Sequence, residues 1–153
     1  MKTKQARRYR GFTLIEMLVV LVIIGLLAGL IGPRLIGHAD EAKVQTAKTQ
    51  VRMLKGALET MHLDLGRFPT KEEGLALLVT PPTDEKIKNK WRGPYLDDPA
   101  VPNDPWGNAY QYGTPGPNGQ PFVLYSFGAD GKPGGEGFDA DIGILPQSTS
   151  APQ

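Results

Sequence analysis

The sequence predicts an α+β protein in which a small antiparallel sheet and a loop-rich C-terminal region pack one long N-terminal helix. That helix is apolar in its first half and amphipathic in its second. Residues 12–31 are almost wholly apolar, and residues 44–65 repeat apolar side chains at alternating spacings of three and four. Such spacing is typical of one helix face. Most of the 19 glycines and 14 prolines follow residue 65, where they predict turns and short strands.

The formal net charge of +1 is unevenly distributed along the chain. The first 11 residues hold five basic side chains and no acid, and the remainder carries 12 basic against 16 acidic side chains. A nucleic-acid-binding protein would keep a basic patch on its folded part, so no nucleic-acid partner is expected. Basic residues beside an apolar segment stay in the cytoplasm. We therefore expect a cytoplasmic N-terminus and a C-terminal domain on the other side of the membrane.

The apolar run is long enough to cross a bilayer, at about 1.5 Å per helical residue. It contains a single charged residue, Glu16. A carboxylate near the bilayer centre costs roughly 2.5–3.5 kcal/mol, and less near the edge. The residues alone leave three interpretations open: a single-pass anchor, a cleaved secretory signal, or an anchor whose Glu16 reaches the headgroups. A plain anchor or a plain signal gives no reason for this carboxylate.

The stretch RGFTLIEMLVVLVIIGLLA, residues 10–28, resembles the class III signal of type IV pilins and pseudopilins. Its pattern is a short basic leader, a glycine, a phenylalanine and a glutamate as the fifth residue after the cut. The resemblance implies that a prepilin peptidase cleaves between Gly11 and Phe12 and that the new Phe12 amine is N-methylated. Glu16 could then pair with that amine, within one subunit or between neighbours. A buried charge left unpaired is costly, so such a pair would fix the packing register.

Four segments follow from this organisation: a cleaved leader at 1–11, a transmembrane or filament-core helix at 12–32, a periplasmic globular domain at 33–145 and a flexible tail at 146–153. Pro33 lacks an amide donor and predicts a kink or a weak turn in the helix. The amphipathic half is expected to seat a sheet from the same chain, with a coiled-coil dimer as the alternative. Its apolar stripe consists of Val44, Ala47, Val51, Leu54, Leu58, Met61 and Leu65.

The helix is expected to end near Leu65, because Gly66 suits a C-cap and a proline follows at position 69. Thr70 and Glu73 have the spacing of a capping box and predict a short helix. Residues 82–113 are expected to form mostly loop, pinned to the core by the aromatic residues Trp91, Tyr95 and Trp106.

Three short strands are expected, around residues 109–112, 122–126 and 142–145. The dipeptide Asn118-Gly119 lies between the first two and favours a hairpin turn.

Residues 128–143 form a second informative segment, rich in glycine and acids. Clustered carboxylates on a flexible backbone suit a hard cation with oxygen ligands. Asp139 and Asp141 alternate, so an extended chain would place both on one side. The spacing is not that of an EF-hand. The residues alone leave open whether this segment is a calcium site or a mobile acidic turn.

The stretches YSFGADGKPGGEGFDADIG, DPWG and GRFPTKEEGL resemble the major pseudopilins of the type II secretion system. This resemblance implies a calcium ion in the C-terminal loop. The ligands that it implies are the side chains of Asp130, Asp139 and Asp141 and the carbonyls of Phe127 and Lys132, with Glu136 left out as a bystander. The chain has no cysteine, so a metal would replace the disulfide that is common in true type IV pilins.

No enzymatic activity is expected, because His38 and His62 are isolated and none of the motifs H-E-x-x-H, G-x-S-x-G and G-x-x-x-x-G-K-[S/T] is present. The resemblance implies a structural subunit of the periplasmic pseudopilus, a homopolymer that drives export of folded proteins. The partners that it implies are the prepilin peptidase, minor pseudopilins, an inner-membrane platform protein and a cytoplasmic ATPase. The alternatives are a pilus-like subunit in adhesion, motility or DNA uptake, and a membrane-tethered binding module that uses the aromatic residues at 91–112.

Overall fold

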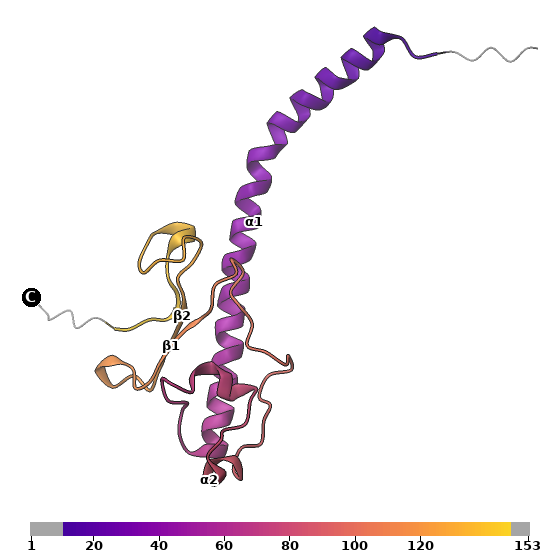
Figure 1. The fold of residues 1–153 in the computed structure, drawn as a ribbon. Coiled ribbons are helices and arrows are strands. Elements are labelled where there is room, and N and C mark those ends of the chain that lie inside the picture. Colours follow the sequence, from indigo (N-terminus) through magenta and orange to yellow (C-terminus); the bar gives the residue numbers. More distant parts are fainter. Residues whose placement is uncertain (1–10, 148–153) are drawn as a thin grey trace, which may run out of the picture. The chain divides into compact units, whose positions relative to one another are not determined.

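The computed structural model describes the backbone of residues 11–147, and their side chains apart from residues 30–38. The chain divides into two compact units, Met1–Ala39 and Asp40–Gln153. The helix α1 (Leu14–Leu65) begins in the first unit and ends in the second, and Figure 1 follows it along the colour scale. The backbone is helical at Pro33 as well, and the kink predicted there stays a prediction. The predicted leader up to residue 10 and the tail from residue 148 lie outside the described residues.

The first unit exposes its apolar side chains. From Phe12 to Leu27, each large apolar side chain is 47–85% accessible to solvent. Within the part of the chain that the structure describes, no helix has both the length and the hydropathy that a membrane crossing requires.

The second unit is built on the amphipathic half of α1. Five members of the predicted stripe are buried (Ala47, Val51, Leu54, Leu58 and Met61), and its end residues Val44 and Leu65 are half-buried. The partners that cover the stripe come from the same chain: Leu75, Leu77, Leu78, Leu96, Tyr110, Phe122 and Leu124. This confirms the prediction that the stripe seats a sheet from the same chain, and it shows that η1 and loop residues cover the stripe as well.

The sheet contains three antiparallel strands in the order β1-β2-β3. They are β1 (Gln111–Gly113), β2 (Val123–Ser126) and β3 (Ile142–Ile144), each within about two residues of its expected position. One row across the sheet joins Tyr112, Leu124 and Ile144, and the central member of this row is fully buried. In the hairpin turn, Asn118 and Gly119 have φ of 54° and 80°, the positive values that favour this dipeptide. The α+β class is confirmed.

Four short helices differ from the sequence expectation. Two of them are single turns, η2 (Pro117–Gly119) in the connection between β1 and β2 and η3 (Gly137–Asp139) within residues 128–143. The helix predicted after Thr70 is a single 3₁₀ segment, η1 (Gly74–Leu78). A one-turn helix, α2 (Glu85–Lys88), lies in the region expected to be loop. Asp84 caps α2 by accepting a hydrogen bond from the amide of Lys86 at 2.9 Å. A capping residue of this kind satisfies an otherwise free amide and allows a short turn to form even between prolines.

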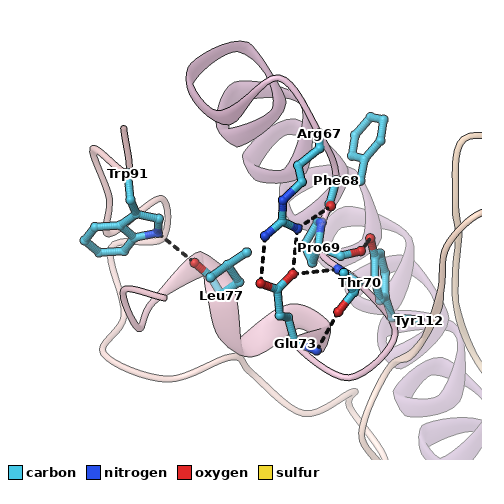
Figure 2. A network of polar contacts seen from close by, with 8 residues as sticks. All are labelled: Arg67, Phe68, Pro69, Thr70, Glu73, Leu77, Trp91 and Tyr112. Atoms are coloured by element: carbon cyan, nitrogen blue, oxygen red, sulfur yellow. Dashed lines mark hydrogen bonds and ion pairs between the residues drawn. The ribbon is translucent and has the colours of Figure 1, made fainter. Parts of the chain in front are cut away.

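The connection between α1 and η1 is held by a closed polar network, shown in Figure 2. Arg67 donates to both carboxylate oxygens of Glu73, at 2.6 and 2.7 Å, and to the Phe68 carbonyl at 3.0 Å. Glu73 also accepts from the Thr70 amide at 2.8 Å and donates its own amide to the Thr70 hydroxyl at 3.3 Å. These last two hydrogen bonds form the predicted capping box.

Two of the three aromatic side chains that were expected to pin the 82–113 region to the core do contact core elements, namely Trp91 and Tyr95. Trp91 donates its indole N–H to the Leu77 carbonyl at 2.9 Å, also visible in Figure 2. Tyr95 donates to Asp64 near the end of α1 at 2.9 Å. Trp106 is half-buried, and its indole nitrogen is buried without a hydrogen-bond partner among the described residues.

Candidate functional site

The predicted cleavage bond, Gly11–Phe12, lies just before the first turn of α1. Residues 11–13 are not helical, and both residues of this bond are exposed. An exposed, non-helical peptide bond is the form that a peptidase can bind in an extended conformation. The geometry therefore leaves the bond accessible from outside the helix.

Glu16 occupies the first turn of α1, where it forms a capping box with Thr13. Its carboxylate accepts from the Thr13 amide at 3.5 Å, and its amide donates to the Thr13 hydroxyl at 3.3 Å. A negative charge here also faces the positive end of the helix dipole. The pattern Thr-x-x-Glu signals this box, so the signal was available in the sequence at this position.

The predicted calcium ligands differ in exposure and in hydrogen bonding. Asp130 is exposed and accepts from the Lys132 amide at 3.0 Å. Asp139 is exposed as well, and its amide donates to the Glu136 carbonyl at 3.2 Å. Asp141 is half-buried, and one of its oxygens accepts from the Gly134 amide at 3.0 Å.

Residues 128–143 form an acidic loop, and its two halves lie against each other. The Ala129 amide donates to the Phe138 carbonyl at 3.0 Å. A Cβ atom added at Gly128 would lie 2.7 Å from the Ala140 carbonyl oxygen, so only glycine fits there. The predicted ligand segments 127–132 and 139–141 are thus neighbours, although no three acidic, histidine or cysteine side chains of the described residues are grouped as a metal site.

One atom in this loop lacks the partner that its burial requires. The second carboxylate oxygen of Asp141, Oδ1, is buried and has no hydrogen-bond partner among the described residues. An unsatisfied buried carboxylate oxygen is costly, and a cation is one of its natural partners. Together with the other carboxylate and carbonyl oxygens of the loop, it gives a donor set whose chemistry fits calcium.

Sequence reasoning missed a buried carboxylate next to this loop. Asp104, in the stretch DPWG, is 4% exposed, and its carboxylate accepts from the hydroxyl of the fully buried Ser126 at 2.5 Å. The turn signal Asp-Pro-x-Gly was available in the sequence, but its partner lies 22 residues away. Burial, with the Asp104 charge nearby, raises the pKa of Tyr110. The Tyr110 phenol thus stays protonated and donates to Gln50 at 2.7 Å.

The histidines do not form a site within the described residues. His62 stacks on Phe68 with ring centroids 4.3 Å apart and planes 12° apart, which is a packing role. The side chain of His38 lies outside the described residues.

Comparison with known proteins gives consistent matches along the chain. A family described as type II secretion system protein G matches residues 34–145, and a prokaryotic N-terminal methylation motif matches residues 6–32. The chain is 47% identical to the type II secretion system core protein G of Pseudomonas aeruginosa over 91% of this chain and 96% of that protein. It is 45% identical to the protein of the same name from Vibrio cholerae, over 92% and 94% of the two chains.

A solved structure is similar as well. The crystal structure of the major pseudopilin from the type 2 secretion system of enterohaemorrhagic Escherichia coli matches with a TM-score of 0.56 and 35% identity. The match covers 72% of this chain and 92% of that one. The family match spans most of the chain, and the relatives are similar over nearly their whole length. The chain therefore belongs to the protein G family of the type II secretion system, the family of the major pseudopilin.

Proposed function

We propose that this chain is the structural subunit of a periplasmic pseudopilus that drives export of folded proteins, and that it has no catalytic activity. The observation that carries this proposal is the exposed apolar surface of residues 12–27, with side chains 47–85% accessible. A continuous apolar surface of this kind requires lipid or protein to cover it. A membrane covers it in the stored subunit, and the same segments of neighbouring copies cover it in the filament.

Maturation begins at the junction that the methylation motif includes. The prepilin peptidase cleaves between Gly11 and Phe12, and the new Phe12 amine is then N-methylated. Before assembly the subunit crosses the inner membrane once, with its N-terminus in the cytoplasm and the C-terminal domain in the periplasm. The inner-membrane platform protein and the cytoplasmic ATPase then add subunits to the homopolymer, and minor pseudopilins complete it.

Glu16 changes partner during this process. In the uncleaved chain, its carboxylate accepts from the Thr13 amide at 3.5 Å, which is its one hydrogen bond among the described residues. Cleavage creates a positive amine on Phe12, next to Thr13 in sequence, which is a stronger partner than a neutral amide. In the filament the Glu16 carboxylate pairs with the Phe12 amine of a neighbouring subunit. This pairing sets the axial register, because a misplaced subunit leaves a charge buried and unpaired.

A calcium ion stabilises the acidic loop in this proposal. The carboxylates of Asp130, Asp139 and Asp141 and the carbonyls of Phe127 and Lys132 would hold it. The support is the buried, unpartnered Oδ1 of Asp141 and the contact between the two halves of the loop. Calcium would supply positive charge that links carboxylates which otherwise repel one another. A metal bound only by the folded state stabilises it by mass action.

The mass of the mature protein tests the maturation step. We expect the purified protein to lack residues 1–11 and to carry one added methyl group on Phe12. A chain that retains the leader, or one cut after the apolar run, would contradict the proposal.

Deletion of the coding sequence in the source bacterium separates the two functional classes. The pseudopilus proposal predicts that folded proteins accumulate in the periplasm while adhesion, motility and DNA uptake are unchanged. Loss of one of those three with normal secretion would favour the pilus-like alternative.

Calcium titration tests the metal. At 100 times its dissociation constant, a bound ion adds about 2.7 kcal/mol to the free energy of unfolding. We therefore expect a chelator to lower the melting temperature of the full-length chain in detergent micelles. The double variant Asp139→Asn and Asp141→Asn should melt at the chelated temperature with or without calcium. A wild-type melting temperature that is the same with and without calcium would exclude the site.

A further inference from the structure

Asp104 is the one charged side chain that is buried in the part of the chain that the structure describes. Removing a carboxylate from water is costly unless hydrogen bonds replace its solvation. Three donors do so here. One oxygen accepts from the amides of Trp106 and Asn108, at 3.1 and 2.8 Å, and the other accepts from the Ser126 hydroxyl at 2.5 Å. A carboxylate held by three donors has a fixed position and orientation.

The Ser126 hydroxyl links the fixed Asp104 carboxylate to the backbone of the acidic loop. Ser126 is the last residue of β2, and its oxygen accepts from the Gly128 amide at 3.0 Å. Because the Ser126 hydroxyl donates its hydrogen bond to Asp104, its lone pairs face Gly128. The Gly128 backbone has φ of 73° and packs against the carbonyl of Ala140. The conformation at Gly128 sets the direction in which the chain continues to Asp130.

The side chain of Asn108 lies beside the same segment, near Gly131. A Cβ atom added at Gly131 would lie 3.4 Å from the side-chain nitrogen of Asn108. Asn108 is itself fixed by Asp104, which accepts from its amide, while the Asn108 carbonyl accepts from the Asp104 amide at 2.8 Å. The Asp104 turn, residues 104–108, is therefore linked to Gly128 through Ser126, and its Asn108 side chain lies beside Gly131, on the other side of Asp130.

We propose that Asp104 is a positioning residue for the calcium loop, acting through Ser126 and Asn108 without touching the metal. This inference rests on the calcium site proposed above. With Asp104 in place, the segment 127–132 is held close to Asp139 and Asp141 before the ion arrives. Without it, the segment has to be ordered at the moment of binding, and that cost appears as lost affinity. Residues that orient metal ligands in this way are typically worth 10- to 100-fold in affinity.

The test uses the full-length chain in detergent micelles and calcium chloride as the probe, with the dissociation constant measured by isothermal titration calorimetry. Ser126→Ala is the leading variant, because it removes the link to Gly128 and leaves both amide hydrogen bonds of Asp104 intact. Asp104→Asn is the second variant. We expect both to bind calcium about 10- to 100-fold more weakly than wild type.

Two controls separate positioning from general stability. Asp98→Asn removes an exposed acid of the neighbouring loop and should leave the affinity unchanged. Glu73→Ala weakens the fold at a distant network and should lower the calcium-free melting temperature without changing calcium affinity. Hydrogen exchange of the calcium-free protein supplies a further readout. Ser126→Ala should speed exchange at the amides of residues 128–131 more than at those of β2.

The possible results test the calcium site and the positioning role of Asp104 separately. A wild-type chain that binds no calcium overturns the calcium site and, with it, this role of Asp104. A wild-type chain that binds calcium, with Ser126→Ala within twofold of it, overturns the positioning role alone.

Discussion

The chain contains two capping boxes of the same sequence pattern, Thr13-x-x-Glu16 and Thr70-x-x-Glu73. In both, the glutamate amide donates to the threonine hydroxyl at 3.3 Å. The reciprocal contact differs: the threonine amide lies 3.5 Å from the Glu16 carboxylate but 2.8 Å from that of Glu73. The same local signature therefore gives a loose box before α1 and a tight one before η1.

The difference comes from a third residue. Arg67 meets Glu73 with two short hydrogen bonds, and the side chains of this pair are 31% and 27% exposed. The hydrogen bond raises the pKa of Arg67 and lowers the pKa of Glu73, so each stabilises the charge of the other. Glu16 is exposed and has no such cation among the described residues. The carboxylate of Glu73 is committed to the fold, whereas that of Glu16 remains available to another molecule.

Removing the charge of Glu16 should have the largest effect. Glu16→Gln keeps an oxygen that can accept from Thr13 but cannot pair with an amine as a carboxylate does. We expect normal membrane insertion and cleavage, with filament yield at background, measured by sedimentation and electron microscopy. Thr13→Val is the matched control, since it removes the capping hydroxyl and keeps the carboxylate. Normal filaments from Glu16→Gln would show that assembly does not require the negative charge.

Glu73→Ala should act on stability alone. It leaves the half-buried Arg67 without its anion and the Thr70 amide without its acceptor, at a cost of about 1.5 kcal/mol. Urea denaturation of the full-length chain in micelles measures this loss. Asp98→Ala, at an exposed position away from this network, should leave the midpoint unchanged. Equal midpoints for Glu73→Ala and wild type would mean that the tight box contributes nothing.

Acid should weaken the tight box. The pKa of Glu73 is lowered from its ordinary value of 4.5, first by the hydrogen bond from Arg67. The unfolded chain therefore binds this proton more readily than the folded one. The stabilisation is complete above pH 4.5 and is lost as the pH falls through the lowered pKa of the folded state. Glu73→Gln should reduce the fall in stability below pH 4.5, and an unchanged slope would contradict the assignment.

The smallest effect is expected at alkaline pH. Tyr112 donates to the Pro69 carbonyl, next to Thr70, at 2.9 Å, and burial raises its pKa from 10.0 to about 12. The folded state holds this proton more tightly, so the contribution is complete below pH 10 and is lost as the pH rises toward 12. Tyr112→Phe should be less stable than wild type at neutral pH and should narrow that gap above pH 10. A gap that is constant with pH would exclude the phenol as the titrating group.

The sequence predicted those elements whose signals are local. The α1 stripe repeats with helical spacing, the Asn118-Gly119 turn needs positive φ at both positions, and Thr70 and Glu73 are three residues apart. Each of these patterns restricts the backbone within a few residues. The one-turn helix α2 was missed because its signal, Asp84 as a cap, is short and surrounded by prolines and charges.

The candidate site was less predictable because its contacts are distant in sequence. Arg67 joins Glu73 across six residues and Asp104 joins Ser126 across 22, and no periodicity connects such positions. The carboxylates of the acidic loop were recognised as candidate ligands by type. Whether these carboxylates can approach one another depends on the backbone conformation at glycines such as Gly128, which composition does not encode. The calcium ligands therefore remain predictions, whereas the residues that shape their backbone are given by the fold.

The hydrogen bond between Asp104 and Ser126 couples the substitutions that these two positions tolerate. A substitution at position 126 that removes the hydroxyl leaves a buried carboxylate oxygen without a hydrogen-bond partner. A substitution at position 104 that removes the carboxylate leaves the hydroxyl and two amides without their acceptor. Either single step passes through a less stable protein, while a paired replacement avoids most of that loss. Positions 104 and 126 should therefore be inherited as a pair, so that across related genomes the identity of one predicts the identity of the other.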